Sequence, residues 1–149
     1  LCDALAEDEH VAVGLLTGNT AYGAKAKTRA YGLADRFAFG GYGDLRTDRD
    51  QIAEDAQQAA AAHLAQGSPP EALCGTMVIG DTPADVRCGR AIGAYVVAVA
   101  TGRHSWETLE AAAPDLLLHD LTQTDPLLAE VAAARQRCRP RQASFQESL

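Results

Sequence analysis

Short apolar runs alternate with helical patterns along the chain. Val11–Thr17, Thr76–Gly80 and Tyr95–Ala100 are continuous apolar runs of strand length, and Leu116–Leu118 is a shorter one. Such runs are typical of strands that are buried on both faces of a parallel sheet. A further short strand is predicted at Phe37–Phe39, immediately before the loop GGYGD.

Helices are predicted between and after these strands. The helical segments are Thr20–Tyr31, Thr47–Gln66, Pro83–Ile92, Ser105–Ala113 and Asp125–Ala134. Gly32 and Gly67 follow the first two and are expected to end them. This alternation predicts an α/β fold, a Rossmann-like parallel sheet with helices on both faces. In such sheets a ligand binds beyond the carboxyl ends of the strands.

The chain length and the composition of its end indicate the domain organisation. A chain of 149 residues suggests one domain, which we place at residues 1–134. From Arg135 onward the sequence is polar, rich in arginine and without period. We expect residues 135–149 to form a disordered tail.

Net charge and cysteine content limit which binding partners and which cellular compartment are expected. The net charge of −7 argues against nucleic acid and against an anionic membrane surface, since either would need a basic patch. No apolar run approaches the roughly 20 residues that cross a bilayer. The four cysteines form no C-x-x-C pair and are expected to be reduced thiols, which favours a cytoplasmic location; they are Cys2, Cys74, Cys88 and Cys138.

The first chemically interesting strand end is Thr17-Gly18-Asn19. A hydroxyl and free backbone N–H groups at a turn that opens a helix can bind a phosphate or another anion. The alternative is an ordinary helix N-cap, because threonine and asparagine both cap well.

The second is Gly80-Asp81-Thr82-Pro83-Ala84-Asp85. Asp85 can be the acid of a capping box that begins at Thr82, but that role leaves Asp81 unexplained. A carboxylate at the mouth of a parallel sheet is costly without a positive partner. Mg2+ uses one or two carboxylates together with waters and substrate oxygens, so the two acids are candidate metal ligands.

The third is the mixed-charge loop after GGYGD, which leads to Arg49 near a helix start. The helix dipole does not favour a cation there, so Arg49 could face an anion; the alternative is a solvated surface arginine. A hydroxyl, a cation and two acids at one sheet edge are the groups that metal-assisted phosphoryl transfer uses.

The segments VGLLTGN, YGLADRFAFGGYGD, VIGDTPADVRCGRAIGA and VVAVATGRHSWETLEAAAPDLLL carry a resemblance to a known family. Over residues 1–131 the chain resembles the haloacid dehalogenase-like (HAD) hydrolase superfamily, and within it the phosphoglycolate phosphatase-like members. The resemblance implies a phosphoryl-binding hydroxyl, two acids that position Mg2+ and a cation that neutralises phosphate. In this chain the matching residues are Thr17 with Gly18 and Asn19, then Asp81 and Asp85, then Arg49 or alternatively Lys27.

The family's first motif, an Asp-x-Asp after the first strand, has no match here, and neither has the cap inserted after it. The segment LCDALAEDEH resembles the helix that follows the cap. Asp48-Arg49-Asp50 has the Asp-x-Asp spacing but lies in a polar loop. The resemblance implies that the first aspartate forms an aspartyl-phosphate, so we expect no turnover by this chain alone. We also expect the natural gene product to be longer at its amino end.

The missing motif also has a structural consequence. In the family the first strand lies in the middle of the sheet, so two interior strand edges lose their partner here. Either the two strands pair directly, or another chain fills the gap, or the edges stay open and permit self-association.

Three functions follow from these observations. The first is a Mg2+-dependent phosphatase of small phosphorylated metabolites in the intact protein. The alternatives are a 2-haloacid dehalogenase, which needs no metal, and a non-catalytic, degenerate HAD-like binding domain.

Overall fold

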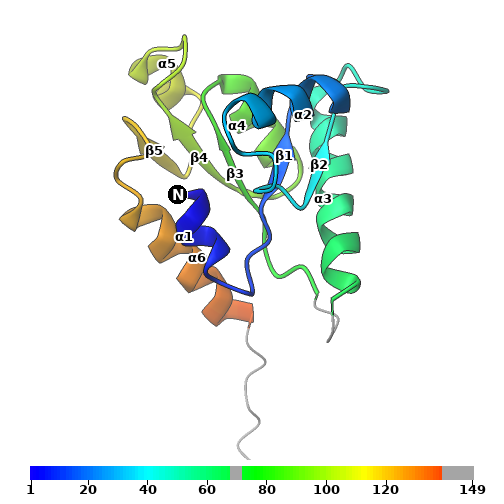
Figure 1. The fold of residues 1–149 in the computed structure, drawn as a ribbon. Helices are drawn as coiled ribbons and strands as arrows, with labels where there is room; N and C mark the ends of the chain where they lie inside the picture. Colours follow the sequence, from blue (N-terminus) through cyan, green and yellow to red (C-terminus); the bar gives the residue numbers. More distant parts are fainter. Residues whose placement is uncertain (68–71, 139–149) are drawn as a thin grey trace, which may run out of the picture.

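Parallel strands form two separate groups in the computed structural model, which describes residues 1–67 and 72–138 (Figure 1). The strands are β1 (Gly14–Leu16), β2 (Phe39–Gly41), β3 (Met77–Gly80), β4 (Tyr95–Val99) and β5 (Leu116–Leu118). The helices are α1 (Cys2–Ala6), α2 (Ala21–Ala30), α3 (Arg49–Ala65), α4 (Pro83–Ala91), α5 (Trp106–Ala111) and α6 (Asp125–Cys138). The predicted α/β fold with a parallel sheet is therefore confirmed.

The sheet is interrupted between β1 and β3. β1 pairs with β2 in register Gly14↔Phe39, while β3, β4 and β5 form a second parallel group. In space the order is β5, β4, β3, β1, β2 (Figure 1). Within the described residues no strand pairing joins β1 to β3, so the edges of these two strands that face each other are open, at the place where the resemblance puts the family's first strand. Of the three outcomes considered for these edges, direct pairing is not the one observed.

The core of the larger group follows the alternation of β4. Val97 and Val99 face the cluster formed with α1, β5 and α6, whereas Val96 and Ala98 face α4 and α5. All four are nearly inaccessible to solvent. Because successive side chains of a strand point to opposite faces, this single strand organises both layers of helices.

The strands beside the gap are less well covered. No residue of β1 is fully buried, and Ile79 of β3 is 36% exposed. An interior strand of a doubly wound sheet is normally buried on both faces. The apolar surface beside the gap is therefore accessible.

Helix α3 holds the two strand groups together. It packs against β1 and β2 on one side and against α4 on the other. Near its middle, the Gln57 Nε2 donates to Thr76 Oγ1 at 3.2 Å and to the Ile92 carbonyl at 3.1 Å. Because Thr76 precedes β3 and Ile92 ends α4, this one side chain ties the first group to the second.

The predicted boundaries of β1, β2 and α6 were wrong. β1 covers Gly14–Leu16 rather than Val11–Thr17, because only these three residues pair with β2. β2 occupies residues 39–41 rather than 37–39, because Gly40 and Gly41 pair with β1 and belong to the strand rather than to the loop. Helix α6 continues to Cys138, so residues 135–138 are not part of a tail. Arg135 Nη1 donates to both oxygens of Asp8, at 3.0 and 3.2 Å, which holds this last turn against the segment after α1. The remainder of the predicted tail, residues 139–149, lies outside the described residues.

The predictions on cysteines and membranes have mixed outcomes. Cys2 and Cys88 are free thiols, as expected, but Cys74 is disulfide-bonded. Sequence spacing gave no sign of this bond because it reports only neighbours along the chain.

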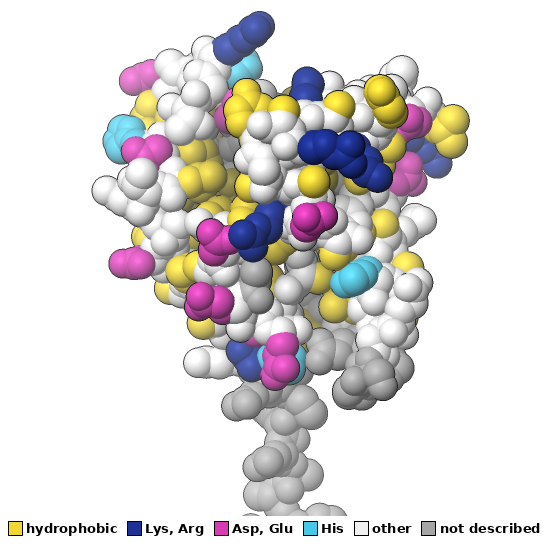
Figure 2. All heavy atoms as spheres, in the orientation of Figure 1, with side chains coloured by type: hydrophobic (Ala, Val, Ile, Leu, Met, Phe, Trp, Pro, Cys, Tyr) yellow, Lys and Arg dark blue, Asp and Glu magenta, His cyan; other side chains and the backbone are white. Residues whose placement is uncertain are grey.

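In the described part of the chain, no helix combines the length and apolar character needed to span a bilayer. Figure 2 shows positive and negative side chains interspersed over the face in view.

Candidate functional site

The turn after β1 is held by its own side chains. The Thr17 Oγ1 accepts hydrogen bonds from the backbone N–H of Asn19 at 3.1 Å and from its Nδ2 at 2.8 Å. The Lys27 Nζ of α2 donates to Asn19 Oδ1 at 3.1 Å. Thr17, Asn19 and Lys27 therefore belong to one hydrogen-bonded chain. Among the described residues the Thr17 hydroxyl donates no hydrogen bond, so its hydrogen is available to an anion, and the Lys27 ammonium lies at the other end of this hydrogen-bonded series.

The turns after β1 and β2 touch through their backbones. The Gly43 N–H donates to the Asn19 carbonyl at 2.9 Å, and a Cβ at Gly43 would lie 2.2 Å from the Gly18 carbonyl oxygen. Asp44 then accepts from the Ala21 N–H at 2.7 Å, which caps the start of α2 together with Thr20. Sequence reasoning missed this second cap, because Asp44 follows a different strand.

Arg49 connects the two strand groups at their carboxyl edge. It is the first residue of α3, after the N-cap Asp48, and its Nε donates to Asp85 Oδ1 at 3.0 Å. Its Nη2 also contacts Asp85 Oδ1, and a Cβ at Gly18 would be 3.7 Å from its Nη1. The anion that faces Arg49 is thus Asp85, and Arg49 is not a freely solvated surface arginine.

The electrostatics of Arg49 agree with this geometry. Burial alone lowers the pKa of Arg49, but the hydrogen bonds and charge of Asp85 outweigh it and hold the pKa above its ordinary value. Asp85 is 5% exposed, so an unpaired carboxylate there would be costly. Arg49 therefore keeps its positive charge beside the buried Asp85 carboxyl group.

The two acids of the Gly80–Asp85 segment differ in their surroundings. The Asp85 Oδ2 accepts from the Asp81 N–H at 3.2 Å, the Thr82 N–H at 3.1 Å and the Thr82 Oγ1 at 2.8 Å, completing the capping box of α4. Together with Arg49, these donors engage both of its oxygens. The Asp81 carboxylate has no hydrogen bond or ion pair within the described residues, and it lies against Gly102 in the turn after β4.

The residues present fit a divalent cation at Asp81. No group of three or more His, Cys, Asp or Glu side chains in the described residues is arranged to hold a metal. Mg2+ does not require such a group, because waters and substrate oxygens complete its coordination. Asp81 offers an unengaged carboxylate, while Asp85 is committed to Arg49 and to the cap. Both remain predicted metal residues, with Asp81 as the one free to bind directly.

The other acids considered from the sequence have structural roles. Asp48 accepts from the Asp50 N–H at 2.9 Å as the N-cap of α3, and Asp50 lies 3.6 Å from the Arg87 Nε. The Asp-x-Asp spacing at residues 48–50 therefore serves a helix start. Beside the edge, Trp106 stacks on His119 with ring centroids 4.2 Å apart.

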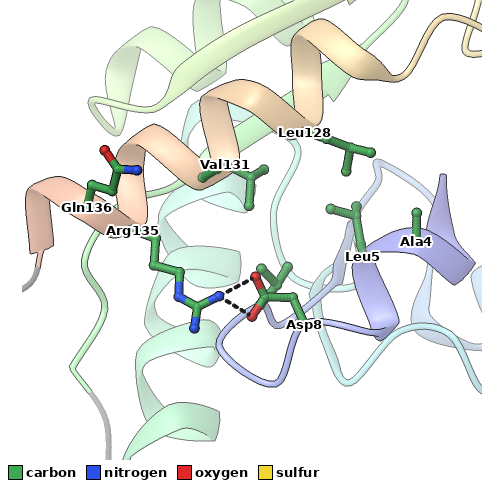
Figure 3. A pocket seen from close by; sticks show the side chains of 9 residues that line it. Ala4, Leu5, Asp8, Leu128, Val131, Arg135 and Gln136 are labelled. Carbon is green, nitrogen blue, oxygen red and sulfur yellow. Dashed lines mark hydrogen bonds and ion pairs between the residues drawn. The ribbon is translucent and has the colours of Figure 1, made fainter.

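Cavities occur elsewhere in the molecule. One of about 380 Å³ lies between α1 and α6 and is lined by apolar residues such as Leu5, Leu128 and Val131 (Figure 3). The Asp8–Arg135 ion pair lies at its margin (Figure 3). This cavity contains none of the strand-end residues described above.

Solved structures share this fold. A haloacid dehalogenase-like hydrolase from Streptococcus pneumoniae superposes with a TM-score of 0.65 at 18% identity, covering 89% of this chain and 56% of that one. A predicted phosphatase from Clostridium acetobutylicum gives a TM-score of 0.63 at 19% identity, covering 88% and 58%. The chain thus spans a little over half the length of these structures. A comparison with curated proteins gave no match.

A comparison with protein-family models adds evidence from the sequence to this similarity of fold. The family model described as HAD-hydrolase-like matches residues 50–124, which is half of the chain. The matched region contains the Gly80–Asp85 segment and the strands on either side of it. The chain therefore belongs to the HAD-like hydrolases.

Proposed function

We propose that the intact protein is a Mg2+-dependent phosphatase of small phosphorylated metabolites, and that this chain carries its phosphate and metal sites without the nucleophile. The observation that supports this most is the convergence at one sheet edge of the Thr17 hydroxyl, two cations and an unengaged carboxylate. A parallel sheet binds its ligand at this edge.

Each residue has a distinct part in the proposal. The Thr17 hydroxyl and the Gly18 turn bind the phosphoryl oxygens, and Arg49, or alternatively Lys27, supplies positive charge to them. The Asp81 carboxylate holds Mg2+, which when bound neutralises phosphate charge. Asp85 positions Arg49 and the start of α4. The attacking carboxylate comes from outside this chain.

The site is tested by binding rather than by turnover. Inorganic phosphate is titrated into the chain by calorimetry with and without MgCl2, in the wild type and in Thr17→Val and Asp81→Asn. We expect uptake in the wild type, at least tenfold weaker binding in Thr17→Val and loss of the magnesium effect in Asp81→Asn. Thr28→Val, in α2, is the matched control because the Thr28 hydroxyl bonds only the Lys25 carbonyl among described residues.

Turnover separates the alternatives. We expect no hydrolysis of p-nitrophenyl phosphate by this chain; hydrolysis that is lost in Asp81→Asn would contradict the missing nucleophile. For the intact protein, activity that survives a metal chelator would favour a 2-haloacid dehalogenase. Failure of the chain to take up phosphate or magnesium would favour the degenerate binding domain.

We further propose that the open edges of β1 and β3 accept a strand, and that the isolated chain self-associates through them. Unpaired N–H and C=O groups at an edge are a template for pairing. Sedimentation should show dimers or larger species, reduced by Ile79→Lys beside the gap. Leu121→Lys is the control, since Leu121 is similarly exposed at 40% but follows β5. A monomer at all concentrations would refute self-association.

We also propose a cytoplasmic location. The absence of C-x-x-C pairs and the free thiols of Cys2 and Cys88 support it, whereas the disulfide of Cys74 opposes it. Alkylation of intact cells followed by mass spectrometry tests it. Trapping Cys74 as a free thiol would agree with this location, and finding it oxidised would indicate an oxidising compartment.

A further inference from the structure

The turn after β4 approaches Asp81 more closely than a side chain would permit. A Cβ at Gly102 would lie 2.0 Å from Asp81 Oδ2, 2.8 Å from its Cγ and 3.1 Å from its Cβ. All three nearest atoms belong to the same side chain. The Asp81 carboxylate thus occupies the space that any other residue at position 102 would fill.

The requirement for glycine at this position is spatial. Among the described glycines, positive φ angles occur at Gly32 and Gly93, and Gly102 is not one of them. The backbone at 102 can therefore accept an L-residue, and the three nearest atoms that its Cβ would meet all belong to Asp81. Gly80 has the same relation to the other acid, because a Cβ there would lie 2.5 Å from Asp85 Oδ2.

No hydrogen bond or ion pair among the described residues fixes the direction of the Asp81 carboxylate, so this direction depends on the space at Gly102. The Asp81 backbone N–H is fixed by Asp85 Oδ2 at 3.2 Å, but its carboxylate has no hydrogen bond or ion pair in the described part of the chain. A carboxylate with no bonded partner takes the direction that packing leaves open. Gly102 supplies that open direction.

We propose that Gly102 is a positioning residue, which lets the Asp81 carboxylate lie over the turn between β4 and α5 and so determines how well the chain binds a divalent cation. The proposal rests on the proposed function, in which Asp81 is the ligand. A methyl group at 102 would displace the carboxylate oxygen, which a cation site with preferred oxygen geometry would not tolerate.

The first test uses Gly102→Ala with titration calorimetry of MgCl2 alone. We expect Gly102→Ala to weaken magnesium uptake at least tenfold and Asp81→Ala to abolish it. Gly75→Ala should bind like the wild type, because nothing lies within 4 Å of a Cβ at Gly75. Uptake by Gly102→Ala equal to the wild type, with loss in Asp81→Ala, would overturn this proposal and leave the proposed function standing. No uptake by the wild type would overturn both.

The second test needs no metal. Gly102→Ala should lower the unfolding temperature of the wild type but not that of Asp81→Ala, because the double variant has no carboxylate for the methyl group to strike. If Gly102→Ala alone fails to fold, the double variant should fold. An equal loss of stability in both backgrounds would show that Gly102 is needed for another reason, and the proposal would fail.

Discussion

Arg49 and Asp85, 36 residues apart, form an ion pair that joins the start of α3 to the start of α4 across the interruption in the sheet. The two strand groups share no ladder in the described residues, so contacts made by α3 replace it. With the Gln57 hydrogen bonds, this pair anchors α3 to the second group at two points.

Replacement of Arg49 should therefore destabilise the chain more than an ordinary surface arginine would. In Arg49→Gln, the 5%-exposed Asp85 loses its charged partner, and we expect about 2 kcal/mol of lost stability in urea unfolding. Arg46→Gln is the matched control, since Arg46 pairs with Asp55 and both side chains are at least 40% exposed. It should cost no more than about 1 kcal/mol. Equal losses would contradict the bridging role of Arg49.

Close packing of α3 on β2 depends on Gly41. A Cβ there would lie 2.3 Å from the Ile52 carbonyl oxygen and 2.8 Å from the Ala56 Cβ. Gly41→Ala should cost about 1–3 kcal/mol, because the helix must move away from the strand. Thermal unfolding compares it with Gly75→Ala, which should stay within about 0.5 kcal/mol of the wild type. A neutral Gly41→Ala would mean that α3 is not held as described.

Acid should weaken the attachment of β5 to β4 through Asp115. Its carboxylate accepts from the Val96 N–H at 2.7 Å and from Arg90 Nη1 at 2.7 Å. Burial raises the pKa of Asp115, but these donors outweigh it and place the pKa below its ordinary value. Since the folded pKa is the lower one, this stabilisation is present above the unfolded pKa and is lost as pH falls through the folded pKa.

Urea unfolding at several pH values below 6 checks this expectation. Asp115→Asn should be less stable than the wild type at pH 6, and the difference should shrink as the pH drops below the ordinary range of an aspartate. Asp35→Asn, at an exposed position, serves as the control. A difference that is constant with pH would argue against a charged Asp115 as the cause.

The two thiols that are free among the described residues, Cys2 and Cys88, should differ in reactivity. Cys88 is 0% exposed, its Sγ donates to the Asp85 carbonyl at 3.3 Å, and burial, followed by the charge of Asp85, raises its pKa. Because the thiolate is the reactive form, iodoacetamide at pH 8 should label Cys2 in the native chain and leave Cys88 unlabelled. Peptide mass spectrometry after denaturation should show both labelled. Native labelling of Cys88 at the rate of Cys2 would show that the start of α4 opens readily.

Features that depend on neighbours along the chain could be predicted from the sequence. The capping box of Thr82 and Asp85 lies within one helical turn, and the observed bonds are those that the spacing indicates. Gly32 ends α2 with a φ of 69°, a conformation that glycine adopts without strain. Strand β4, which is buried from Val96 to Val99, was located by its continuous apolar run, because a strand covered on both faces has no polar side.

Boundaries decided by distant partners were missed. β2 begins two residues later than predicted because pairing with β1, not β propensity, brings Gly40 and Gly41 into the strand. Helix α6 runs past its predicted end, and there Arg135 pairs with Asp8, 127 residues away. In both places a contact outweighs the local composition.

The sequence alone determined the order of the elements, the family resemblance and the residues that gather at the carboxyl edge, because these follow from local pattern and from the direction of parallel strands. Only the tertiary structure decided what each of those residues contacts: Asp85 with Arg49, Asn19 with Lys27, and Asp81 with the bare face of Gly102. The physical reason is that hydrogen bonds and steric exclusion act over a few ångströms in space, and separation along the chain does not report that distance.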